Sequence, residues 1–107
     1  MANTLFHHAT GSGNIASTLA PTTSWQLEEI RLHLSAAGAA NNLTATIDSI
    51  TGATYNIVLL TQDMTAVVDL VWKPSSPMEF KLGDELDIAW TNGSSRDYGL
   101  EIIFKGI

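Results

Sequence analysis

The 107-residue sequence contains no cysteine and only five lysine and arginine residues, and both shortages narrow what the protein can be. Without cysteine, neither a disulfide framework nor a thiolate metal site can hold the fold together. Five scattered basic residues against eleven acidic ones give a net charge of −6, which cannot supply the basic stripe that a phosphate backbone requires. The sequence therefore predicts a fold held by apolar packing and strand pairing, with no nucleic-acid partner.

Long apolar runs are also missing. No stretch approaches the roughly 18 consecutive apolar residues of a membrane span. The first eight residues lack the positive charge and the apolar segment of a secretory signal. Because 45% of the residues are hydrophobic and only 15% are charged, the composition is that of an ordered globular protein. We expect a soluble chain made in a cytoplasm, with no membrane partner.

Apolar and polar residues alternate with a period of two over much of the chain, which predicts short strands. The alternation is clearest in residues 86–90 and 98–104, and residues 43–47 also alternate. Turn residues separate these segments, at Asn41-Asn42, Thr51-Gly52, Gly83-Asp84 and Asn92-Gly93. Six to eight short strands without a strong helix predict an all-β protein, an antiparallel two-sheet sandwich of jelly-roll or Ig-like type.

Two segments require a choice. In residues 25–34 the apolar positions change parity, so a single strand needs a β-bulge near Glu28 and Glu29 to keep both sets facing the core. A helix over residues 24–40 is the alternative, but Gly38 lies inside it and the alternation favours the strand. Residues 55–60 are apolar on both parities, which predicts a central or doubly covered strand.

The first 24 residues are rich in Thr, Ser, Gly, Asn and Ala and show no sustained period. This composition predicts an extended N-terminal arm over residues 1–24, followed by the sandwich domain over residues 25–107. The arm has four large apolar residues, which we expect to bind a partner: Leu5, Phe6, Ile15 and Leu19.

No catalytic, cofactor-binding or metal-binding residues are predicted. His7 and His8 are adjacent, so on an extended segment their side chains point to opposite faces and cannot share a metal. Asp84, Glu85 and Asp87 cluster at a glycine turn, where carboxylates either gather calcium or cap backbone amides. The ordered ligand spacing of a calcium loop is missing, which favours capping. The sequence therefore offers no combination of a nucleophile, a base and a group that orients the base, and we expect no enzymatic activity.

Three tryptophans could form either a core or an exposed platform for sugars. Trp72 shares its parity with Leu70, and Trp90 shares its parity with Ile88. This pattern favours core packing over a sugar-binding surface.

The order of features from Trp25 to Phe104 resembles that of small β-sandwich virion proteins of tailed bacteriophages, including head-decoration and fibre-type subunits. The resemblance rests on residues 25–34 (WQLEEIRLHL), 80–88 (FKLGDELDI) and 98–104 (YGLEIIF). It implies a structural subunit of the virion without cofactors. Such a subunit would be a homo-oligomer, with a trimer favoured, and would dock through its arm onto other virion proteins. The alternative is a carbohydrate- or receptor-binding β-sandwich module.

Overall fold

Strands account for most of the chain, as the alternating pattern predicts. The computed structural model describes residues 3–107, and within that range it contains nine strands and one short 3-10 helix. The elements, in chain order, are β1 (Asn3–Gly11), β2 (Ile15–Leu19), β3 (Trp25–Leu34), β4 (Asn42–Asp48), η1 (Ala53–Tyr55), β5 (Ile57–Asp63), β6 (Asp69–Trp72), β7 (Met78–Phe80), β8 (Glu85–Trp90) and β9 (Tyr98–Gly106). The prediction of an all-β sandwich is confirmed, although the strands outnumber the six to eight expected.

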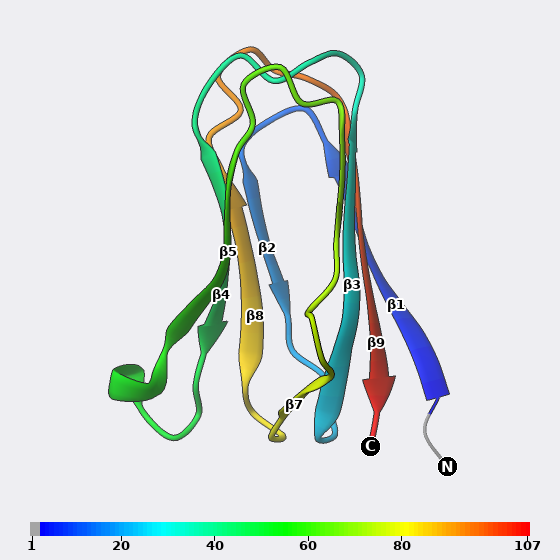
Figure 1. Cartoon of the computed structure of the whole chain (residues 1–107), viewed down its shortest axis with the longest axis vertical. Helices are drawn as coiled ribbons and strands as arrows, with labels where there is room; N and C mark the ends of the chain where they lie inside the picture. Colours follow the sequence, from blue (N-terminus) through cyan, green and yellow to red (C-terminus); the bar gives the residue numbers. More distant parts are fainter. Residues whose placement is uncertain (1–2) are drawn as a thin grey trace.

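Two antiparallel sheets pack face to face (Figure 1). Sheet A has the strand order β1-β9-β3-β6, and β7 also pairs with β3. Sheet B has the order β2-β8-β4-β5. The chain passes from one sheet to the other at every connection except β4 to β5 and β6 to β7. Each sheet therefore contains strands from both ends of the sequence.

Strand β3 contains the bulge that its change of parity predicts. Its register against β9 shifts between Leu27 and Glu29. Before the shift Trp25 and Leu27 face the core, and after it Ile30, Leu32 and Leu34 do. One extra residue in the bulge lets a strand with two parities bury both apolar sets. The strand is confirmed, and the alternative helix is excluded.

The core lies between the sheets and draws its buried residues from five strands, β2, β3, β4, β8 and β9, and from the β5–β6 connection. Strands β1, β5, β6 and β7 add partly buried side chains. The buried hydrophobic residues are Ile15, Leu19, Trp25, Leu27, Ile30, Leu32, Leu34, Leu43, Ala45, Ile47, Met64, Leu86, Ile88, Trp90, Leu100, Ile102 and Phe104. Trp25 and Trp90 are fully within this core, and Trp72 is half-buried against it. The prediction of core packing for Trp90 is confirmed.

The predicted N-terminal arm is wrong for the residues that the structure describes. Asn3–Gly11 pairs with β9 along its whole length, and Ile15–Leu19 pairs with β8. Residues 3–19 thus supply one outer strand to each sheet, and no domain boundary falls at residue 24. Met1 and Ala2, also assigned to the arm, lie outside the described residues. The sequence hid these strands because their inward positions include small or polar side chains such as His7, Ala9 and Ser17.

The predicted central strand at residues 55–60 is also wrong. Tyr55 ends the 3-10 helix, and β5 is the outermost strand of sheet B. Ile57 and Val58 remain 54% and 55% exposed. An apolar run on both parities normally indicates a strand that is covered on both faces. Here the described residues cover neither the Ile57 nor the Val58 side chain.

Candidate interaction surfaces

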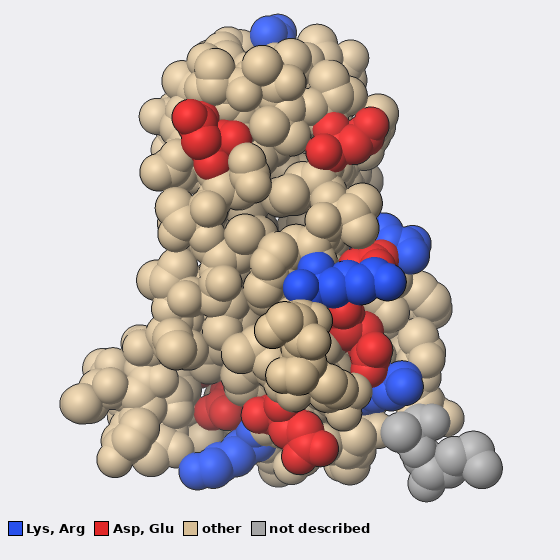
Figure 2. Space-filling model, viewed as in Figure 1, with Lys and Arg blue, Asp and Glu red and all other residues tan. Residues whose placement is uncertain are grey.

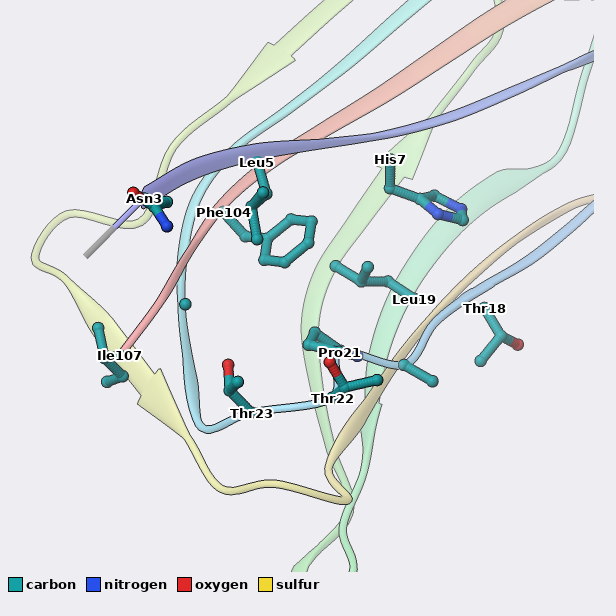
Figure 3. A pocket seen from close by; sticks show the side chains of 12 residues that line it. Asn3, Leu5, His7, Thr18, Leu19, Pro21, Thr22, Thr23, Phe104 and Ile107 are labelled. Carbon is teal, nitrogen blue, oxygen red and sulfur yellow. The ribbon is translucent and has the colours of Figure 1, made fainter. Parts of the chain in front are cut away.

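The sandwich is open at the end where β1 starts and β9 finishes. At this lower end in Figure 1, β1 lies on one flank and the β4–β5 hairpin projects from the other. Between β1 and the segment that joins β2 to β3 is a groove of about 660 Å³ (Figure 3). Its position follows from the topology, because β1 and β2 belong to different sheets and diverge from one another.

The groove has an apolar floor and a polar rim. Leu5, Leu19 and Phe104 form the apolar part, and Figure 3 shows their side chains lying close together beneath β1. The other lining residues are Asn3, His7, Thr18, Ala20, Pro21, Thr22, Thr23, Gly106 and Ile107. Among the described lining residues no Asp, Glu, Lys or Arg side chain occurs. This arrangement suits an uncharged group that has an apolar body and a polar tip.

His7 connects the two sheets at the inner end of the groove. Its Nε2 atom lies 2.9 Å from the hydroxyl oxygen of Ser17 on β2. Burial lowers the pKa of His7, and the neighbouring positive charge of protonated His8 lowers it further. The imidazole therefore favours its neutral form and adds no positive charge to the groove. As predicted, the two histidines point apart, since His8 bonds Glu101 on the opposite face of sheet A.

The four predicted partner-binding residues separate into three environments. Ile15 is buried in the protein's own core, which leaves it no surface for a partner. Leu19 also packs in the core, but its remaining 5% exposed surface lies at the floor of the groove. Leu5 faces the groove and is 43% exposed. Phe6 is 55% exposed, and its ring stacks parallel to that of His8 at 6.3 Å. Because neighbours on a strand alternate in direction, Leu5 and Phe6 present apolar surface on opposite sides of β1.

A second apolar surface occupies the projecting hairpin. Ile50, Tyr55, Ile57 and Val58, which we call the knob, are all more than half exposed. Residues 49–62 contain no Asp, Glu, Lys or Arg, and the lower left lobe of Figure 2 is correspondingly free of charged atoms. The sequence signal for the knob was present as the apolar run 55–60, but it was assigned to a covered strand.

Hydrogen bonds hold the knob in a fixed shape. The backbone amide of Ser49 donates to the Asn56 side-chain oxygen at 2.7 Å, which closes the tip of the hairpin. At its base, the carboxylate of Asp84 accepts from the amides of Ile50 at 2.9 Å and Lys81 at 3.0 Å. The capping role expected for an acidic residue at this turn is thereby confirmed. The knob is an ordered projection, and an ordered surface loses less conformational entropy when it binds.

Comparisons with known proteins identify a similar fold and no family. No protein-family model and no curated protein matches the chain. The crystal structure of Drosophila NLP-core, described in connection with pentamer formation and histone binding, matches with a TM-score of 0.52 and 10% identity over 92% of this chain and 96% of that one. The mitogen from Yersinia pseudotuberculosis matches at 0.48 and 16%, over 95% and 86% of the two chains. A protein of the infectious bursal disease virus Gx strain matches at 0.45 and 13%, over 99% of this chain and 32% of that one. At these identities the likeness concerns the fold alone.

The outer face of sheet A carries most of the ion pairs. The side chain of Glu29 is only 8% exposed and is paired with both Arg31 and Lys73. The Nζ atom of Lys73 lies 3.3 Å from the Glu29 carboxylate. Burial alone would raise the pKa of Glu29, but hydrogen bonds from Arg31 and Lys73 outweigh it and lower the pKa. Arg31 also bonds Glu101, which bonds His8. This network joins β1, β9 and β3 across the sheet and leaves its outer face polar, unlike the groove and the knob.

Two further observations concern metals and membranes. Within residues 3–107, no three His, Asp or Glu side chains gather as metal ligands would. The described part of the chain also contains no helix with the length and hydropathy to cross a bilayer.

Proposed function

We propose that this chain is a non-enzymatic structural subunit of a tailed-bacteriophage particle, exposed on its surface and assembled as a homo-oligomer, with a trimer favoured. It is made in the host cytoplasm and resides in the virion as a capsid decoration protein or another surface-exposed subunit. It docks onto other virion proteins, without a cofactor, and binds neither nucleic acid nor membrane.

The observation that carries this proposal is the exposed apolar surface on the open edge of sheet B. Strand β5 ends the sheet, and the knob beside it places four apolar side chains in solvent. Proteins that remain monomeric usually protect such an edge with lysine, proline or a covering loop. Strand β5 (Ile57–Asp63) contains no lysine or proline, and its one charged residue, Asp63, stands at its end. An edge with so little protection beside exposed apolar side chains is suited to assembly.

The strand order is compatible with a virion protein. The orders β1-β9-β3-β6 and β2-β8-β4-β5 place the first and last strands side by side and return the chain repeatedly between two sheets. We assign this arrangement to the jelly-roll type, which viral capsid proteins and lectins use. The burial of Trp25 and Trp90 removes two rings from any platform for sugars, so the structural subunit is preferred over a carbohydrate-binding module.

The solution mass of the purified protein tests self-association. Size-exclusion chromatography with light scattering over a dilution series is expected to give a closed oligomer, a trimer first, whose mass is a multiple of 11.5 kDa. A strict monomer at every concentration would overturn the homo-oligomeric subunit. The virion location is tested separately, by immunogold labelling of intact particles of the phage that encodes the chain. Label on the particle surface is expected, and unlabelled particles would overturn that part.

A further inference from the structure

We propose that the knob of one copy inserts into the groove of the next copy, so that identical chains join head to tail in a closed ring. This inference rests on the proposed self-association and adds the two surfaces that make the contact. The knob consists of Ile50, Tyr55, Ile57 and Val58, and the groove has the floor of Leu5, Leu19 and Phe104.

The two surfaces lie on opposite flanks of the same end of the sandwich (Figure 1). A contact between two different surfaces repeats from copy to copy, and it closes into a ring when the rotation between copies is suitable. By contrast, pairing of β5 with β5 of a second copy would use one surface twice and stop at a dimer. The presence of both a projection and a hollow favours the repeating contact.

The distribution of charge favours a second copy as the occupant. The chain carries a net charge of −6, so two copies repel each other over most approaches. The knob segment, residues 49–62, has no charged side chain, and the described groove lining has no Asp, Glu, Lys or Arg. Contact between these surfaces therefore buries apolar area without bringing acidic side chains of the two copies together.

Tyr55 is the best candidate for the inserted anchor. It is 65% exposed and stands at the end of η1, at the tip of the projection. The volume of about 660 Å³ lies within the range of roughly 300–1,000 Å³ that buries most of a drug-sized ligand, so a tyrosine and a neighbouring aliphatic side chain can enter together. Leu5, Leu19 and Phe104 would contact the ring, while threonine hydroxyls on the rim offer partners for the phenol oxygen.

The exposure of Leu5 is consistent with this contact. Leu5 faces the groove on the inner side of β1, where a closed sandwich would bury it, yet it is 43% exposed. On the other flank, Ile57 is likewise exposed although it lies on an inward-facing position. It pairs with the buried Ile47 but is itself 54% exposed. One head-to-tail contact would cover both residues, one on each partner.

The test uses a knob variant, Tyr55→Asp, and a groove variant, Leu5→Asp, in the full-length chain. Each alone is expected to weaken association by about 30-fold or more, as loss of a central anchor does, and to run as a monomer in light scattering. Matched controls are Phe6→Asp, which places the same charge on the opposite side of β1, and Val71→Asp, an exposed valine on β6. Both controls are expected to remain oligomeric. Circular dichroism verifies that every variant is folded, and Thr22→Trp, which fills the groove from its exposed rim, replaces Leu5→Asp if that variant is unfolded.

Mixing the two variants distinguishes the geometries. The intact groove of Tyr55→Asp can accept the intact knob of Leu5→Asp, and the complex must stop there, at twice the 11.5-kDa mass of one chain. This 1:1 complex is the expected result. If groove variants remain oligomeric while Tyr55→Asp is monomeric, or if the mixture stays monomeric, the head-to-tail contact is overturned although self-association stands. A monomeric wild-type protein would overturn both the contact and the proposed oligomer.

Discussion

The carboxylate of Asp84 accepts a hydrogen bond from the backbone amide of Ile50 at 2.9 Å, which ties the β4–β5 hairpin to the turn before β8. Its second oxygen accepts from the amide of Lys81 at 3.0 Å. The backbone carbonyl of the same residue accepts from the indole of Trp25 at 3.2 Å. One residue therefore connects the projecting knob, the turn and the core.

Replacement of Asp84 by alanine is expected to lower the free energy of unfolding by about 1–3 kcal/mol, because two amides lose their acceptor in a part-buried site. Urea denaturation followed by tryptophan fluorescence measures the change. Asp87→Ala is the matched control, since Asp87 accepts only from the exposed hydroxyl of Thr18, and its effect should be within about 0.5 kcal/mol. Equal effects of the two substitutions would contradict the capping role.

Gly83→Ala is expected to destabilise the protein and to displace the knob. Gly83 has a φ of +100°, which an alanine adopts only with strain of about 1–3 kcal/mol. A Cβ atom there would clash with Cδ1 of Ile50 and would lie 3.1 Å from its Cβ, so the Ile50 side chain must move. Thermal unfolding measures the first effect, and the amide chemical shift of Ile50 reports the second. Gly93→Ala, with open space at its Cβ position, is the control. An unshifted Ile50 amide would count against the predicted contact.

Removal of residues 1–24 is expected to abolish cooperative folding. The truncation deletes β1 and β2, leaves β8 and β9 without their outer partners, and takes Ile15 and Leu19 from the core. Deletion of an independent arm would instead leave a folded sandwich. Circular dichroism during thermal denaturation distinguishes the two outcomes. A sharp transition in the truncated chain would support the independent arm. Phe6→Ser, which removes an exposed side chain from β1 without touching the core, should keep the full transition.

The strands that the sequence predicts well are those with one face in the core and one in solvent. In β4, β8 and β9 every second side chain is buried, so the period of two is visible. The bulge in β3 was also predictable, because only an extra residue reconciles Leu27 with Ile30 on one face.

The outer strands were missed or misplaced for a physical reason. On β1 and β2 the inward pair is His7 with Ser17, a polar contact that breaks the apolar alternation. On β5 the apolar run predicts cover that the single chain does not supply to Ile57. The groove could not be predicted, since it arises where the consecutive strands β1 and β2 diverge into different sheets, and periodicity does not assign strands to sheets. Periodicity reports that a face is apolar but does not identify what covers it.

Protonation of His7 is expected to reduce stability as the pH falls below neutrality. Burial and, as a smaller cause, the charge of His8 lower the pKa of His7 below its ordinary value of 6.5. The folded state therefore binds fewer protons than the unfolded state. Stability should therefore be full above about pH 6.5 and should fall as the pH drops from there toward the lowered pKa. His7→Gln keeps an amide within reach of Ser17 but cannot take a charge. Urea denaturation between about pH 8 and pH 5 should show a smaller decline for His7→Gln than for the wild-type protein. Parallel declines would mean that His7 titrates as freely in the folded protein as in the unfolded chain.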